Sequence, residues 1–324
     1  MIPVILVVGT AVFLLIYLIP GDPAQAMLGP HATPEALEKL RRQLNLDKPW
    51  YIQYPLWLVR VFQGDLGISV KSKRPVLEEI LNAFPHTIEL VFLSLLLIAI
   101  PVGITLGVLA SVKQHSLFDY VSTTLSVVGV SMPAFWLGLL LILLFSIHLK
   151  WFPIFGLLDT GVHLKVITHF YIIDALLTKN FSALGNYLFH MILPSVVLAT
   201  IPLSYITRMT RSSMLDILRT EYINTARAKG LSELKVILKH ALRNALIPVI
   251  IVSGTITGLL LGGAVLTETI FGLPGMGRLL VNAILERDFP LVQGCILIFA
   301  FSYNFINLIT DIICQLIEPK GRYG

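Results

Sequence analysis

Charged residues are scarce in this sequence of 324 residues. They make up 13% of it, whereas hydrophobic residues make up 56%. Soluble domains carry about 25% charged residues, so a water-soluble fold could not cover this much apolar surface. The apolar residues also fall into long blocks nearly free of charge, each close to the roughly 20 residues that cross a bilayer as a helix. The composition therefore excludes a soluble protein and predicts an integral membrane protein.

Cysteine is also scarce. Only Cys295 and Cys314 are present, and both lie in the last apolar block. About five helical turns separate them, so they cannot form a disulfide within one helix. No cysteine cluster for a metal ion is available either. We interpret both residues as small apolar side chains used in packing.

Two further absences restrict the function. The phosphate-binding motif Gly-x-x-x-x-Gly-Lys-Ser/Thr does not occur, so we expect no nucleotide site in this chain. The centres of the apolar blocks contain no Asp, Glu, Lys, Arg or His, although ion-coupled carriers and proton pumps place ionisable residues there. We therefore expect no catalytic residue, no metal site and no ion coupling. Any chemical energy must come from another chain.

Six apolar runs predict an all-α protein with six transmembrane helices. The first run has no basic stretch before it, and Pro23 precedes the small residues at 24–26, so we expect a retained helix and not a cleaved signal peptide. The predicted spans are 1–19 and, approximately, 87–112, 119–147, 190–209, 246–266 and 291–317.

Positive charge is concentrated between the fourth and fifth spans. Residues 208–243 contain five more Lys and Arg than Asp and Glu, which equals the net charge of the whole chain. The positive-inside rule places such a loop, at 210–245, in the cytoplasm. Because topology explains the excess, we expect no nucleic-acid partner. Alternation of the spans then places the N-terminus and the tail at 318–324 in the cytoplasm.

The same alternation turns three segments outward. They are 20–86, 148–190 and 267–290. The first is long enough for a small extracytoplasmic domain between the first two spans. Within it, the sequence from Pro34 to Leu40 predicts a short amphipathic helix with Thr33 as its cap and proline at its first position.

The cytoplasmic loop predicts a helix, an elbow and a second helix. Met214, Leu218 and Tyr222 recur every four residues, which indicates one apolar stripe on a helix that runs up to Gly230. Glycine suits the left-handed position just after a helix, and Ser232 can cap a second helix that leads into the fifth span.

The residues beside the elbow are small or basic. Thr225, Ala226 and Ala228 would let a partner surface approach closely, and Arg227 and Lys229 flank them with charge. Two interpretations remain open from these residues alone. The elbow can pass rigid-body motion from a soluble motor to the spans, or it can be a basic loop that only fixes topology.

Small and polar residues mark two of the spans. Gly254, Gly258 and Gly262 repeat every four residues in the fifth, as Gly103 and Gly107 do in the second. Such stripes indicate close helix packing, although the stripe in the fifth span could also line a conduit. Asn304, Asn307 and Asp311 share one face of the sixth span. They predict either hydrogen bonds between helices or contact with a polar substrate.

The elbow also carries a resemblance. Asn224-Thr225-Ala226-x-x-x-Gly230 resembles the coupling motif Glu-Ala-Ala-x-x-x-Gly of bacterial ABC importer permeases at Ala226 and Gly230, and departs from it at Asn224 and Thr225. Both this departure and the long distance to Leu246-Ile-Pro resemble the dipeptide and oligopeptide branch, which includes nickel permeases. Further similar segments are 225–231, 240–245, 19–23, 64–67, 208–214 and 268–272. They lie in the right order over most of the chain, and the chain is most similar to the first subunit of dipeptide permeases.

This resemblance implies the type I importer permease fold in a bacterial cytoplasmic membrane. It also implies a heterodimer with a second permease, an extracytoplasmic binding protein and two cytoplasmic ATPases, which would bind ATP and magnesium. The ATPase-coupling loop would consist of Asn224, Thr225, Ala226, Arg227, Ala228, Lys229, Gly230, Leu231 and Ser232. Candidates for the translocation path are Gly254, Gly258, Asn304 and Asn307.

Two alternatives to peptide import stay open. Permeases for nickel complexes, glutathione or other small peptide-like solutes share the same motifs, although no cluster of His, Cys or Met marks a metal path in this sequence. A channel or structural membrane subunit that needs no ATPase is an alternative of a different class. It would tolerate a bulky residue at Gly230.

Overall fold

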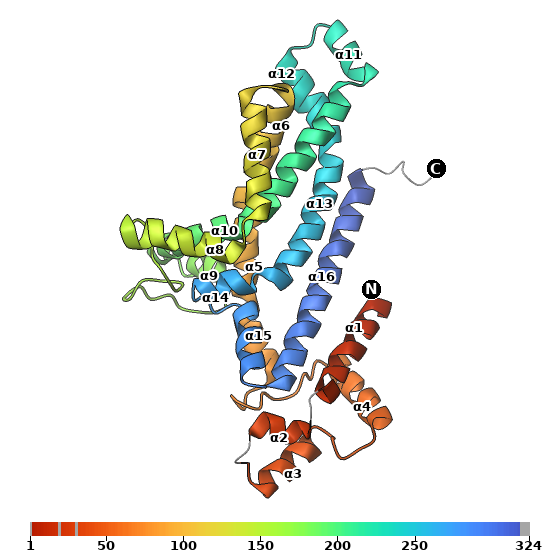
Figure 1. The fold of residues 1–324 in the computed structure, drawn as a ribbon, viewed down its shortest axis with the longest axis vertical. Coiled ribbons are helices and arrows are strands. Elements are labelled where there is room, and N and C mark those ends of the chain that lie inside the picture. The colour runs from red at the N-terminus through yellow and green to blue at the C-terminus, as the bar shows by residue number, and fades with distance from the viewer. Residues whose placement is uncertain (1, 19–20, 30–31, 318–324) are drawn as a thin grey trace.

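The chain is a bundle of helices joined by loops in a computed structural model that describes residues 2–18, 21–29 and 32–317 (Figure 1). No strand is found within these three ranges. The tail predicted at 318–324 and the boundary predicted at 19–20 lie outside the described residues.

Within the described residues, four helices are long and apolar enough to cross a membrane. Three of them contain a predicted run and extend beyond it, whereas Glu233–Gly262 ends before the run predicted at 246–266 does, because a separate helix begins at Val265. They are Val76–Val112, made of α5 (Val76–Phe92), the π-helical η2 (Leu93–Ala99) and α6 (Ile100–Val112); α10 (Phe181–Leu218); Glu233–Gly262, made of α12 (Glu233–Lys235), η4 (Val236–Ala241) and most of α13 (Leu242–Gly263); and α16 (Phe289–Ile317). Because α5 begins at Val76, residues 76–86 are continuous with the second predicted span.

The third predicted run is bent. It forms α7 (Leu117–Ser131), followed by α8 (Ala134–Leu141) and η3 (Ile142–His148), and the two parts meet at 104°. The residue before a proline is disfavoured in the helical conformation. Met132 accordingly has an extended backbone with ψ of 124°, and Pro133 begins the second limb.

The first predicted run forms α1 (Ile2–Leu14) and the short η1 (Leu15–Leu18). Its apolar part, Leu6–Tyr17, is shorter than a full span. The helix packs against α16, where Gln293 Nε2 donates a hydrogen bond of 3.0 Å to the carbonyl of Val12. The described residues thus hold four helices of spanning length, a fifth span if the bent pair counts as one, and two shorter apolar helices, Leu6–Tyr17 and Met276–Leu285.

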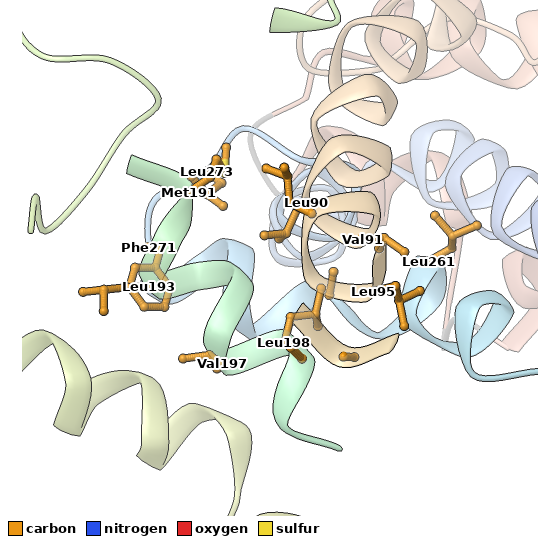
Figure 2. Close-up of a cluster of buried hydrophobic side chains, with 14 of the residues drawn as sticks. Leu90, Val91, Leu95, Met191, Leu193, Val197, Leu198, Leu261, Phe271 and Leu273 are labelled. Atoms are coloured by element: carbon orange, nitrogen blue, oxygen red, sulfur yellow. The ribbon is translucent and has the colours of Figure 1, made fainter. Parts of the chain in front are cut away.

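The largest buried cluster joins side chains of α5, η2, α10 and α13. It also includes Phe271 and Leu273, which lie in the loop that follows helix α14, and α14 itself spans Val265–Ile270. Figure 2 shows Leu90, Val91 and Leu95 on one side of it and Met191, Val197 and Leu198 on the other.

Glycines let α6 approach α10 closely, as the sequence predicted for Gly103 and Gly107. A Cβ at Gly103 would stand 2.8 Å from Ile206 Cγ2, and one at Gly107 would stand 2.7 Å from the carbonyl oxygen of Thr207. Real Cβ atoms do not tolerate such distances, so packing is the reason for both glycines.

Three short helices precede α5. They are α2 (Pro23–Leu28), α3 (Pro34–Gln43) and α4 (Trp50–Phe62), and they gather at one end of the molecule (Figure 1). The predicted helix at α3 is confirmed: Pro34 is its first residue, and Thr33 Oγ1 accepts a hydrogen bond of 3.3 Å from the backbone N–H of Ala36. Two more short helices lie farther along the chain: α9 (Tyr171–Leu177), which packs against α10, and α15 (Met276–Leu285), which packs against α14, α16 and α5.

Candidate functional site

A helical elbow forms the end of the molecule opposite α2 and α3 (Figure 1). It consists of α11 (Glu221–Ala228), a turn and α12, and we call residues 221–235 the elbow. The single helix predicted up to Gly230 is wrong, because α10 ends at Leu218. At Thr220 the backbone is extended with ψ of 151°, and the Thr220 hydroxyl donates a hydrogen bond of 2.6 Å to the carbonyl of Ile217.

Apolar packing holds α11 against the membrane helices. Ile223 is fully buried, and Ala226 is 8% exposed. They belong to a cluster, which we call the elbow cluster, with Val108, Met214, Val236, Ile237, Ala241 and Ala245. An isolated helix of eight residues is unstable in water, so this cluster is what keeps α11 in place. The small side chain of Ala226 packs within the chain, and its predicted contact with a partner stays a prediction.

A hydrogen bond outside this cluster adds a second attachment. Asn244 Nδ2 donates to the Tyr222 hydroxyl at 2.8 Å, which ties α11 to the start of α13. Tyr222 is 41% exposed, so the predicted apolar stripe is buried at Met214 but only partly buried at its last member.

The turn of the elbow depends on Gly230. Its φ of +74° lies in the left-handed region, as the sequence predicted. The N–H of Gly230 donates to the carbonyl of Arg227 at 2.9 Å and closes the end of α11. No atom lies within 4 Å of a Cβ built on this residue, so backbone conformation, and not crowding, selects glycine here. Ser232 stands at the cap position of α12, but its side chain makes no capping hydrogen bond.

An ion pair bridges the two limbs of the elbow. Arg227 donates two hydrogen bonds to the Glu233 carboxylate, of 2.7 Å from Nη2 and 3.1 Å from Nε. This bidentate contact raises the pKa of Arg227 and lowers the pKa of Glu233. Both side chains are exposed, so the pair adds little stability.

The outer surface of the elbow is polar, small and basic. Of the nine predicted coupling residues, Ala226 is buried and Leu231 is half-buried, whereas the others are exposed. The exposed residues are Asn224, Thr225, Arg227, Ala228, Lys229, Gly230 and Ser232. The elbow therefore presents a small, firmly packed knob that faces away from the rest of the chain.

The glycines predicted for the translocation path pack against α16. A Cβ at Gly254 would overlap the side chain of Thr310, and one at Gly258 would stand 2.7 Å from the Tyr303 ring. Gly262 has no atom within 4 Å of its Cβ position. Helix packing thus accounts for Gly254 and Gly258, and a role of either in a path stays a prediction.

Within the described residues, no side-chain hydrogen bond joins Asn304, Asn307 or Asp311 of α16 to another helix, although such bonds were one of the two expectations for them. Asn304 and Asn307 are half-buried, and Asp311 is exposed. Asn304 Nδ2 donates to the carbonyl of Ala300 at 2.7 Å, which is a bond within its own helix. Contact of Asn304 and Asn307 with substrate stays a prediction.

A buried carboxylate organises the loop that follows α14. Glu268 is 1% exposed, and it accepts hydrogen bonds of 2.6 Å from the Thr87 hydroxyl and 3.0 Å from the backbone N–H of Arg278. A carboxylate at the N-terminus of α15 is favourable because the first N–H groups of a helix lack partners within it. Burial raises the pKa of Glu268. The sequence showed Glu268 within a family-like segment but gave no sign of this contact.

A second buried carboxylate links α16 to the segment before α5. Asp288 is 1% exposed, and its Oδ2 accepts hydrogen bonds from the Ser69 hydroxyl at 2.5 Å and the Lys71 N–H at 3.1 Å. The residues around 70 are thereby fixed to the start of α16. Sequence reasoning missed this link, since 219 positions separate Ser69 from Asp288.

Across the described residues, no group of three or more His, Cys, Asp or Glu side chains could hold a metal ion. Long apolar helices that end in a rigid polar elbow define an integral membrane protein of the transport class. Residues 99–323 match the family described as "Binding-protein-dependent transport system inner membrane component", and residues 1–91 match the N-terminal part of such components. The chain belongs to this family. It is a permease subunit of an ABC importer and not an enzyme.

Three similar proteins align with this chain over nearly their full length. The chain is 46% identical to the di/tripeptide transport system permease protein DppB of Pseudomonas aeruginosa, with 100% of this chain and 96% of the relative aligned. It is 44% identical to the dipeptide transport system permease protein DppB of Escherichia coli K12, over 99% and 96%. It is 43% identical to the protein of the same name from Alkalihalophilus pseudofirmus, over 100% and 97%.

Proposed function

We propose that this permease moves dipeptides or short oligopeptides into the bacterial cytoplasm. The proposed cargo is supported by the 43 to 46% identity, along nearly the whole chain, to permeases named for dipeptide and di/tripeptide transport. The alternative of a channel that needs no ATPase has no support in these names or in the family. Nickel complexes and glutathione remain the alternative cargo.

The proposed topology has six spans with both termini in the cytoplasm. The four long helices, the bent pair α7 and α8, and α1 supply the six, in the arrangement of the type I importer permeases. The excess of basic residues in 208–243 supports a cytoplasmic elbow. Segment 20–86 and the loop 148–190 would then face outward and meet the binding protein, and the segment at 268–290 would belong to the outer gate.

The proposed role of the elbow is to receive motion from an ATPase. Its buried side, anchored by Ile223 and Ala226, joins it to α6, α10 and η4, while its exposed side is free for a partner. A packed helix transmits a displacement that a mobile loop would absorb. Closure of two ATPases on ATP would push the elbow and, through the elbow cluster, shift the long helices between inward-facing and outward-facing states.

The proposed assembly supplies what this chain lacks. A second homologous permease completes the conduit, since 11% of the apolar window of α16 is buried within this chain and the rest needs a partner or lipid. Two ATPases bind ATP and magnesium, and an extracytoplasmic protein delivers the cargo.

Uptake by cells that lack this permease tests the cargo. We expect that restoring the gene restores uptake of a radiolabelled dipeptide and leaves uptake of radioactive nickel unchanged. A matched strain that carries Gly230→Trp should take up no more dipeptide than cells that lack the permease, with nickel uptake again unchanged. Restored nickel uptake without dipeptide uptake would contradict peptide import while leaving the elbow's role intact.

A further inference from the structure

Helix α4 carries a broad apolar face that the described part of the chain leaves uncovered. The large exposed side chains on this face have exposed fractions from 38% at Leu56 to 70% at Phe62. They are Tyr51, Ile52, Leu56, Val59 and Phe62. Arg60 is the only charged residue among the 13 of the helix. An apolar face of this size on one short helix indicates an interaction surface.

Contacts with α1 fix which face of α4 is turned outward. Gln53 is 6% exposed, and its Oε1 accepts a hydrogen bond of 2.6 Å from the Tyr17 hydroxyl. The Tyr54 hydroxyl lies 2.8 Å from Thr10 Oγ1, and the Tyr54 ring packs on Phe13 with centroids 5.3 Å apart. Because this side of α4 is bound to α1, the opposite, apolar side is held in the exposed position.

The apolar face of α4 continues onto α1. Large apolar side chains of α1 are also exposed, among them Leu6 at 36%, Val7 at 70% and Leu14 at 45%. Since α1 is the first predicted span, we expect these side chains to face the hydrocarbon of the bilayer. The uncovered face of α4 therefore adjoins a surface that is expected to contact lipid.

The length of α4 excludes a further span. Thirteen residues rise about 20 Å as a helix, whereas the hydrocarbon core is about 30 Å thick. Tryptophan and tyrosine concentrate where hydrocarbon meets the headgroups, and Trp50 and Tyr51 stand at the first turn of α4. A short helix with one apolar side and aromatic residues at its end is typical of an interfacial helix.

We propose that α4 lies in the interface of the bilayer, with its apolar face among the lipids, at the end of the molecule opposite the elbow. The helix then works as an anchor that holds the outer end of α1 and the neighbouring α2 and α3 at a fixed depth. Only Arg60 is charged in α4, and its first turn holds Trp50 and Tyr51, residues of the kind that concentrate at the lipid interface, which favours lipid over a protein partner. The anchor depends neither on the cargo nor on the elbow.

Spin labels on the intact complex in lipid nanodiscs test this anchor. The labels are attached to Val59→Cys and Phe62→Cys, with Arg42→Cys on the exposed side of α3 as the matched control, after Cys295 and Cys314 are replaced by alanine. We expect the ratio of relaxation by oxygen to relaxation by water-soluble chromium oxalate to be about threefold or more higher at 59 and 62 than at 42, because an interfacial helix turns this face into the acyl chains.

Two results would overturn the proposal. A ratio at 59 and 62 equal to that at 42 would show that the face is in water. Exclusion of both reagents would show that another protein chain, such as the second permease or the binding protein, covers it.

A photoreactive benzoylphenylalanine at position 62 gives an independent measurement without cysteine replacement. Adducts with phospholipid are expected in mass spectra of the purified complex. Adducts with a protein chain in place of lipid would also contradict the anchor.

Discussion

Replacing Ile223 by alanine tests whether the elbow cluster holds the elbow rigid. Ile223 is fully buried, and the substitution removes three carbons from the cluster. Such substitutions cost about 2 to 5 kcal/mol in packed sites. The neighbouring pair of Arg227 and Glu233 is exposed and worth less than about 1 kcal/mol, so it cannot compensate. Each 1.4 kcal/mol is a factor of ten, and we expect amide exchange in residues 223–229 to accelerate by about 30-fold or more.

Hydrogen exchange of the purified complex measures this effect, with Leu234→Ala as the matched control. Leu234 lies in the second limb of the elbow and is 68% exposed, so the same loss of three carbons should leave exchange within about threefold of the unmodified chain, as for most surface substitutions. We also expect Ile223→Ala to insert normally, because the membrane helices do not depend on α11. Exchange in Ile223→Ala equal to that in Leu234→Ala would refute the reasoning.

Three further predictions concern the ion pair, the buried carboxylate and the glycines. Arg227→Ala should change the stability of the elbow by less than about 1 kcal/mol, since the pair is exposed; a larger change in amide exchange would contradict this. Burial raises the pKa of Glu268, so stability should be fully present below the carboxyl's ordinary pKa and fall as pH rises through the raised pKa. Thermal unfolding of Glu268→Gln should lack this part of the pH dependence, and Glu268→Ala should lose about 1 to 3 kcal/mol because the Thr87 hydroxyl is left without its acceptor. Gly254→Leu should lower the yield of folded protein in gel filtration several-fold, whereas Gly262→Leu, where space is open, should not.

Apolar composition was sufficient to predict the class of fold. Every predicted run is helical, because a chain in lipid must satisfy its backbone hydrogen bonds within each segment. Helix ends were less predictable. Polar and apolar residues alternate through 76–86, so hydropathy did not reveal that α5 begins there, and the bend at Pro133 was visible only as a proline within an apolar run.

The elbow was predictable in outline from Gly230, because a left-handed residue after a helix favours glycine. The burial of Ala226 could not be predicted from the sequence. It depends on the break between Leu218 and Glu221, where α10 ends and α11 begins in a new direction. Contacts between distant positions, such as Glu268 with Thr87, were also beyond sequence reasoning. A single sequence carries no information on which residues meet across 181 positions.

The central claim is that the elbow is the docking point of an ATPase, and Gly230→Trp tests it most directly. Gly161→Trp is the matched control, because Gly161 also has a positive φ, of +101°, and has no atom within 4 Å of its Cβ position. Left-handed backbone costs about 1 to 2 kcal/mol for other residues, so both variants carry a similar strain, but Gly161 lies in the loop before α9, away from the elbow. The measurement is the amount of ATPase subunit that co-purifies with each variant, together with uptake of dipeptide by reconstituted vesicles. We predict that Gly230→Trp inserts but loses both the ATPase and uptake, while Gly161→Trp keeps its ATPase. A Gly230→Trp permease that retains its ATPase and imports peptide at the normal rate would contradict the account.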